Sequence, residues 1–444
     1  MTPPKAGNRK QRRTADRHAH SDYGRNDGQS QHPFATVADP LQEEIQHLAT
    51  LFNQCRYTEA ETIARQQIER FPQQGFFWKV LGALLAGQGH SADSLEIMQK
   101  AVALLPLDAE AQSNLGLTFH DLGRLHEAEA SYRRAVELKP DYAEALSNLG
   151  ITLHDLGRLH DAEVCYRRAV ALKPDYAEAY SNLGITLHGL GRLIEAEASY
   201  RRAVALKPDY AEAESNLGVT LKELGRLSEA ETSYRRAVAL KPDYAKAHSN
   251  LGNTLKELGR LPEAEACYRR AVALMPDYVE ALSNLGVTLK ELGRLNEAEA
   301  CCRRAVALKP DYAEAESNLG IILTELGRFP EAEVSCRRAV ALKPDYAEAH
   351  LNLSLLNLLK GDFENGLPGY EWRREKRKRT FSKPQWFAGE PLEGKTILLH
   401  SEQGLGDTIQ FCRYARLVAA EGGASGYGGA RLACRVAAWA WGRC

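Results

Sequence analysis

The chain of 444 residues contains no apolar run long enough to cross a membrane, and its basic N-terminus is not followed by the apolar core of a signal peptide. Its nine cysteines have neither the spacing of a metal site nor that of a disulfide framework. Cys165, Cys267 and Cys301 stand where a sister segment has a serine such as Ser131, which is typical of small packing residues in a reducing compartment. We therefore expect a cytoplasmic protein without a membrane span, a metal site or a cofactor.

Net charge is also nearly absent, at −1, but the charges are unevenly distributed. Residues 1–38 carry seven Lys or Arg against three Asp, and residues 373–383 carry seven against one Glu, while the block between them is acidic. Nucleic-acid binding depends on a basic face that neutralises phosphates. The acidic block argues against nucleic acid as a ligand, so binding through the two basic segments is the third of three interpretations.

One segment of 34 residues, Asp175 to Pro208, returns almost verbatim along the chain. A fixed period of this size without long variable linkers is typical of a stacked repeat array. The residue that closes the unit is a proline at nine successive positions 34 residues apart: Pro72, Pro106, Pro140, Pro174, Pro208, Pro242, Pro276, Pro310 and Pro344.

Each unit is expected to form a short antiparallel pair of helices. Pro174 cannot continue a helix, and Asp175 with Glu178 three residues later has the pattern of a capping box at the start of the next one. Apolar residues then recur at helical spacing, and Gly191 stands where the first helix must end in a left-handed residue. A second amphipathic helix follows and ends before Pro208.

The residue types at fixed offsets resemble the tetratricopeptide repeat (TPR) family. The resemblance implies an all-α fold, a right-handed TPR α-solenoid superhelix, over residues 39–378 in about ten units. Residues 39–106 and 345–378 are expected to be degenerate caps, and residues 1–38 a disordered basic arm. The matching positions are Leu146, Gly150, Leu153, Ala162, Tyr166, Ala169 and Pro174.

A different pattern begins after a linker at residues 379–394. Residues 395–420 read as a strand, a glycine loop and a helix, a short βα Rossmann-like fragment in which Gly404, Gly406 and Asp407 would hold an anion. Residues 386–420 resemble the junction in bacterial TPR proteins that carry a C-terminal glycosyltransferase-like domain. The tail, 421–444, lacks Ile, Asp and Lys and shows no second strand, so we expect a truncated or frame-shifted end.

An asparagine occupies the same position of each first helix from residue 107 onward, two residues before the glycine of the unit or, in the last unit, before Ser354. The O-linked N-acetylglucosamine transferases have a TPR superhelix with such an asparagine ladder, and this array resembles theirs. The resemblance implies a peptide-binding groove. The alternative is that each amide only bonds to a neighbouring helix. The ladder consists of Asn114, Asn148, Asn182, Asn216, Asn250, Asn284, Asn318 and Asn352.

Beside the ladder, His120, His154 and His188 are expected to line the groove, because a spacing of one unit is too wide for ligands of one metal ion. The first functional hypothesis is an interaction scaffold that binds a protein or peptide. The second is a TPR-containing glycosyltransferase whose array delivers the acceptor. Only 24 residues follow Ala420, so a donor-binding half is missing, no catalytic residue is assigned, and the scaffold is favoured over an enzyme. The oligomeric state is not indicated by the sequence.

Overall fold

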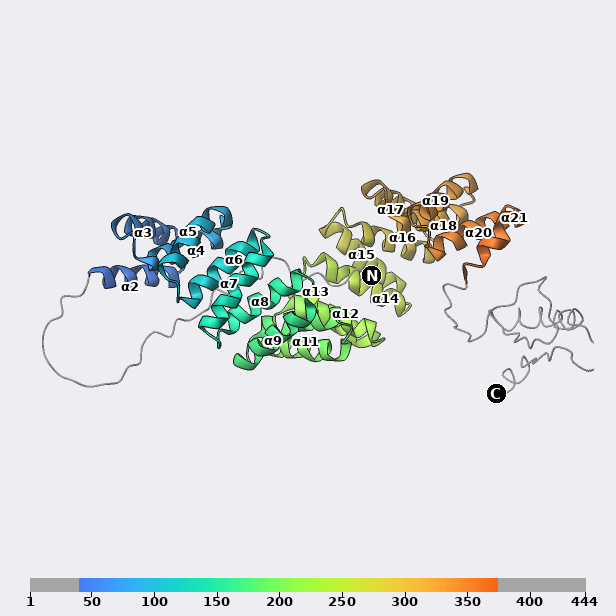
Figure 1. Ribbon diagram of the computed structural model, residues 1–444. Helices are drawn as coiled ribbons and strands as arrows, with labels where there is room; N and C mark the ends of the chain where they lie inside the picture. The colour runs from blue at the N-terminus through green and yellow to red at the C-terminus, as the bar shows by residue number, and fades with distance from the viewer. Residues whose placement is uncertain (1–39, 374–444) are drawn as a thin grey trace, which may run out of the picture. The chain divides into compact units, whose positions relative to one another are not determined.

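The computed structural model describes residues 40–373, and every regular element in that range is an α-helix (Figure 1). Twenty helices, α2 to α21, follow one another as ten pairs of neighbours joined by short turns. All of them lie in the first of two compact units, Met1–Tyr370. The all-α prediction is therefore confirmed for the described part of the chain.

Each pair consists of a first and a second helix, of 13 or 14 residues in all pairs except the last, whose second helix has 8. The first helices are α2 Pro40–Asn53, α4 Gly75–Gln88, α6 Ala109–Asp121, α8 Ala143–Asp155, α10 Ala177–Gly189, α12 Ala211–Glu223, α14 Ala245–Glu257, α16 Val279–Glu291, α18 Ala313–Glu325 and α20 Ala347–Leu359. The second helices are α3 Tyr57–Arg70, α5 Ser91–Leu104, α7 Leu125–Leu138, α9 Leu159–Leu172, α11 Leu193–Leu206, α13 Leu227–Leu240, α15 Leu261–Leu274, α17 Leu295–Leu308, α19 Phe329–Leu342 and α21 Phe363–Tyr370.

Several predictions concern residues outside the described range. These are the basic arm at 1–38, the last residues of the C-terminal cap at 374–378, the linker at 379–394, the Rossmann-like fragment at 395–420 and the tail at 421–444. Gly404, Gly406 and Asp407, expected to hold an anion, belong to this group.

The turn between the two helices of a unit depends on its glycine, as expected. Gly191 has a φ of 73°, and its N–H donates to the carbonyl oxygen of His188 at 2.9 Å, while Arg192 N–H donates to that of Leu187 at 2.9 Å. This pair of bonds satisfies carbonyls at the end of α10, and only glycine adopts the left-handed backbone without steric cost.

The expected capping box at Asp175 is wrong. Helix α10 begins at Ala177, Tyr176 is its N-cap residue, and no side chain caps it. The turn before the helix continues through Tyr176, whose N–H donates to the Lys173 carbonyl at 3.1 Å, so Asp175 lies one residue too early. Glu178 instead accepts a hydrogen bond from Lys207 at 2.9 Å, at the end of the next helix.

Asp108 shows what the cap requires. It occupies the position of Tyr176 in its own unit, and its carboxylate accepts the N–H of Ala111 at 2.9 Å. A carboxylate at the N-cap position satisfies one of the free amides of the first turn.

Each central unit is closed by a tyrosine packed against a glycine. A Cβ atom added to Gly184 would lie 2.7 Å from the ring of Tyr200, so only glycine lets the two helices approach this closely. Tyr200 is fully buried, and the equivalent tyrosines are buried to the same degree. Cys302 and Cys336 replace this tyrosine in two later units and are also fully buried.

Most buried apolar residues of the described range belong to a long cluster or to a shorter one, and two further clusters are small. The long cluster extends from Met98 to Leu356 and includes the tyrosine and leucine positions of the regular units. A separate cluster from Leu48 to Leu85 packs the degenerate first units. The first units therefore have a core of their own composition, with larger side chains such as Phe77 in place of the regular pattern.

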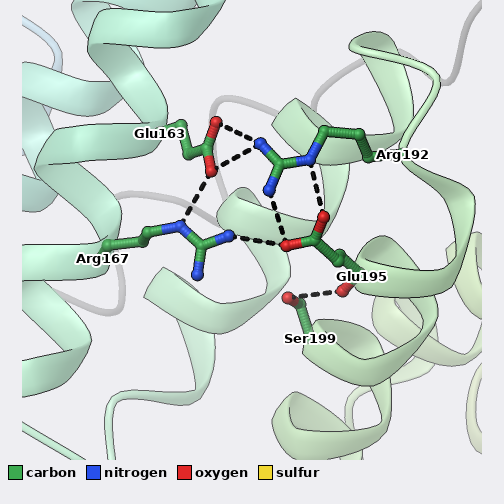
Figure 2. Close-up of polar contacts among 5 residues, drawn as sticks. All are labelled: Glu163, Arg167, Arg192, Glu195 and Ser199. Carbon is green, nitrogen blue, oxygen red and sulfur yellow. Dashed lines mark hydrogen bonds and ion pairs between the residues drawn. The ribbon is translucent and has the colours of Figure 1, made fainter.

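Successive second helices are joined by closed rings of four charged side chains. In Figure 2, Glu163 and Arg167 of α9 face Arg192 and Glu195 at the start of α11, with Ser199 one turn further along α11. Each arginine contacts both glutamates at 2.6–2.8 Å. Because every ring uses one pair of residues from each of two units, it fixes how neighbouring units are placed.

Five such rings follow one another at the repeat period. Networks of this kind hold each side chain with several partners, which lowers the entropic cost per ion pair. The other four consist of Glu197, Arg201, Arg226 and Glu229; Glu231, Arg235, Arg260 and Glu263; Glu265, Arg269, Arg294 and Glu297; and Glu299, Arg303, Arg328 and Glu331.

Candidate functional site

The asparagine ladder lies on helices that touch one another. From α4 to α20, each first helix contacts the first helix of the next unit, whereas second helices approach one another less closely. Between units, each first helix from α4 onward packs mainly against the second helix of the preceding unit and also touches its neighbouring first helices. The eight asparagines, all half-buried, recur in the middle of these first helices.

The backbone under six of the asparagines is held by a buried threonine. Thr186 Oγ1 donates to the backbone carbonyl of Asn182 at 2.9 Å, and Thr220 does the same to Asn216 at 3.0 Å. Each threonine is fully buried, so this bond avoids the free-energy cost of a buried hydroxyl without a hydrogen-bond partner. The asparagine side chain takes no part in this bond, and its amide is left to bind something else.

In the last three units the side-chain amides bond to the preceding unit. Asn284 Nδ2 donates to Asn253 Oδ1 at 3.1 Å. Asn318 Nδ2 donates to Ser283 Oγ at 2.9 Å, and Asn352 Nδ2 donates to Ser317 Oγ at 2.9 Å. These three asparagines connect neighbouring first helices, as the alternative interpretation of the ladder predicts.

The central asparagines differ from them. The side-chain amides of Asn182, Asn216 and Asn250 make no hydrogen bond with any residue in the range 40–373, and the same holds for Asn114. A carboxamide offers two donors and an acceptor, the complement of a peptide group. The central amides are therefore available to a ligand.

A second polar row runs beside the ladder, near the end of the first helices, and also connects one unit to the next. His120 Nε2 lies 3.0 Å from Asp155 Oδ2, and Lys222 Nζ lies 2.9 Å from Glu257 Oε1. The three histidines thus stand beside the ladder but pair with acids. Within the described range, no three His, Cys, Asp or Glu side chains come together as metal ligands would.

His188 of this row has an unusual environment. Its Nε2 lies 3.1 Å from Glu223 Oε2, but the two groups are not aligned for a hydrogen bond, and neither ring nitrogen has another partner among residues 40–373. The distance allows an ion pair only when the imidazole is protonated.

Two buried carboxylates near the ladder were not anticipated from the sequence. Glu214 and Glu316 stand where sister units have Leu146 and Leu282, and are 2% and 3% exposed. Burial raises the pKa of Glu214 against the opposing field of Arg236, which lies 3.5 Å from its Oε1 atom. The other oxygen, Oε2, has no hydrogen-bond partner among the described residues.

Asn253 was also missed, although its position carries a signal. Sister units have an apolar residue there, such as Ile185 or Val219. Asn253 Oδ1 accepts from Tyr268 Oη at 2.7 Å as well as from Asn284. A single polar exception at an apolar repeat position is the pattern that would have indicated it.

No helix in the described part of the chain has the length and apolarity needed to cross a membrane.

Three known structures are similar to part of the chain. YrrB, described as a TPR protein with an unusual peptide-binding site, is 24% identical over 41% of this chain and 95% of its own, with a TM-score of 0.37. MamA is 27% identical over 36% of this chain and 94% of its own, with a TM-score of 0.35. PilF of Pseudomonas aeruginosa is 20% identical over 46% and 91%, with a TM-score of 0.40. None of the curated proteins matches the chain.

Family profiles identify the repeat directly. A tetratricopeptide repeat profile matches residues 107–175, 141–209, 243–311 and 277–345, and a second TPR repeat profile matches residues 218–259. The matches extend over the regular units and coincide with helices α6 to α19. The chain is therefore a tetratricopeptide repeat protein.

Proposed function

We propose that this protein is an interaction scaffold whose first helices bind an extended polypeptide segment. Tetratricopeptide repeats support a role in protein interaction. The observation that carries the proposal is the recurrence of a half-buried carboxamide at one position of successive first helices that touch one another.

The chemistry of the ladder favours the backbone of the ligand over its side chains. Packed helices lie roughly 10 Å apart, and an extended chain rises about 3.3 Å per residue, so a bound segment would meet a new rung about every three residues. Each amide–peptide bond contributes only about 0.5–1.5 kcal/mol net. Several rungs must therefore act together, with little dependence on the ligand sequence.

The test begins with the full chain and a random library of peptides of about 12 residues, a length that crosses several rungs. The best selected peptide is labelled with fluorescein, and its affinity is measured by polarisation. Replacement of Asn114, Asn182, Asn216 and Asn250 by alanine should weaken binding about 10-fold or more. Circular dichroism should show the same melting temperature, because these amides have no partner in the folded array.

Unchanged affinity in that variant, or failure to select any peptide, would contradict the proposal. The glycosyltransferase alternative depends on residues 386–420, including Gly404, Gly406 and Asp407, and no observation within residues 40–373 favours it.

A further inference from the structure

We propose that two sections of the asparagine ladder have different tasks. The open section, Asn182, Asn216 and Asn250, binds the ligand backbone. The clamped section, Asn284, Asn318 and Asn352, joins neighbouring units and does not contact the ligand. This inference rests on the proposed function and assigns the ligand to one part of the ladder.

Apart from Asn352, the two sections have nearly the same sequence around each asparagine. Asn182 and Asn318 both follow a buried serine and both precede the Leu-Gly pair of the unit. Asn318 Nδ2 nevertheless donates to Ser283 Oγ at 2.9 Å, a residue 35 positions earlier, whereas Asn182 makes no bond to Ser147, which has the same offset. Ser147 and Ser283 are 1% and 2% exposed, so burial does not distinguish them.

The clamped amides cannot serve a ligand without a cost. Asn284 and Asn318 would have to give up bonds to Asn253 and Ser283 before binding a peptide group. The acceptors are themselves buried or shared, since Asn253 Oδ1 also accepts from Tyr268. Exchange of one hydrogen bond for another brings almost no net gain, and it leaves a buried hydroxyl unpaired.

The open amides face no such exchange. Each is half-buried, its backbone is fixed by a threonine, and no residue in the range 40–373 bonds to its side-chain amide. Three consecutive open rungs cover roughly 20 Å, the length of about six extended residues. The ligand is therefore an extended polypeptide segment of about this length, which ends before α16.

The clamped section can be tested without a ligand. A double-mutant cycle of Ser283→Ala and Asn318→Ala is compared with the matched cycle of Ser147→Ala and Asn182→Ala, using urea unfolding of the full chain. We expect the two changes in the first cycle to be non-additive, because either one removes the same bond. The changes in the matched cycle should be additive.

A binding test addresses the open section, with the selected fluorescein peptide as the probe. Asn182→Ala, Asn216→Ala and Asn250→Ala in one chain should weaken binding about 10- to 1,000-fold at an unchanged melting temperature. The matched triple variant at Asn284, Asn318 and Asn352 should keep affinity within about twofold and melt at a lower temperature.

The outcomes separate the two claims. Loss of peptide affinity in the clamped triple variant, or additivity in the Ser283–Asn318 cycle, would overturn the division of the ladder. If neither triple variant alters affinity, or no peptide is selected, the proposed function fails and the binding half of the inference fails with it. The double-mutant cycle still decides the clamp in that case.

Discussion

Arg192 Nη1 lies 2.8 Å from both carboxylate oxygens of Glu163, although the two residues are 29 positions apart in the sequence. Arg192 is the N-cap residue of the second helix of one unit, and Glu163 lies in the second helix of the unit before it. The contact therefore connects units and not residues of one helix pair. It is the part of the ring that joins the two units. The placement of adjacent units therefore depends on the charges of Glu163 and Arg192.

The first prediction concerns these rings. Glu163→Gln should lower the free energy of unfolding by about 1 kcal/mol at low salt, because it removes the carboxylate shared by two arginines. The difference from the unchanged chain should shrink as NaCl rises from about 0.05 M to about 1 M, since salt screens exposed charges. Glu137→Gln is the control, because Glu137 is exposed and pairs only with Arg134. Equal salt dependence in both variants would contradict the role of the ring.

The second prediction concerns the pH dependence of Glu214. Burial raises the pKa of this carboxyl above its unfolded value, so its contribution to stability is present below the unfolded pKa and is lost as the pH rises through the folded pKa. Glu214→Leu, the residue type of Leu146 and Leu282, should therefore stabilise the chain by about 1–3 kcal/mol at pH 7. Thermal melts at pH 7 and near pH 4 provide the measurement. The stabilisation by Glu214→Leu should be smaller near pH 4 than at pH 7. An equal stabilisation at both pH values would refute the charge of the Glu214 carboxylate as its cause.

The third prediction concerns the contact between Gly184 and Tyr200. Gly184→Ala should destabilise the chain by about 1–3 kcal/mol, because the added methyl group would lie 2.7 Å from the buried ring. Gly87→Ala is the control, because Gly87 lies in helix α4 with no atom near its Cβ position. That change should stabilise by about 0.5–1 kcal/mol through helix propensity. Denaturant unfolding should show changes of opposite sign in the free energy of unfolding of the two variants. Stabilisation by both would show that the helices carrying Gly184 and Tyr200 are less tightly packed than the structure indicates.

The fourth prediction concerns how stability is distributed. Leu217→Ala and Leu251→Ala each remove a buried side chain, at a cost of about 2–5 kcal/mol. Since each unit contacts mainly its neighbours, hydrogen exchange should accelerate in α12 to α15 and remain slow in α18 and α19. Uniform loss of protection along residues 40–373 would indicate a single cooperative unit instead.

The sequence predicted the helix pairs because their signals are local. Gly191 at the end of a helix and the 34-residue period identify the unit without reference to its neighbours. The cap at Asp175 failed for a local reason as well: the turn after Pro174 is one residue longer than a capping box allows. Backbone hydrogen bonding can move the start of a helix by one residue, and a sequence pattern does not locate a helix end that accurately.

The features that the sequence did not predict arise between units. The Arg192–Glu195 spacing is visible in the local sequence, but closure of the ring by Glu163 and Arg167 depends on partners 28 and 29 residues away. The difference between Asn182 and Asn318 is harder still to predict from the sequence, because the residues around them are nearly the same. The bond to Ser283 distinguishes the second from the first, and Asn318 also lacks the threonine that stands four residues after Asn182.

The ring at Glu163 has a consequence for the number of units. Every closed ring draws one half from each of two adjacent units in the same register, so the joining surfaces of units are interchangeable. Removal of residues 209–242, one complete period, would bring Glu197 and Arg201 opposite Arg260 and Glu263, which already close rings of the same design. Gain or loss of whole periods by recombination between near-identical coding segments would therefore leave the junctions intact, and array length can vary without compensating substitutions.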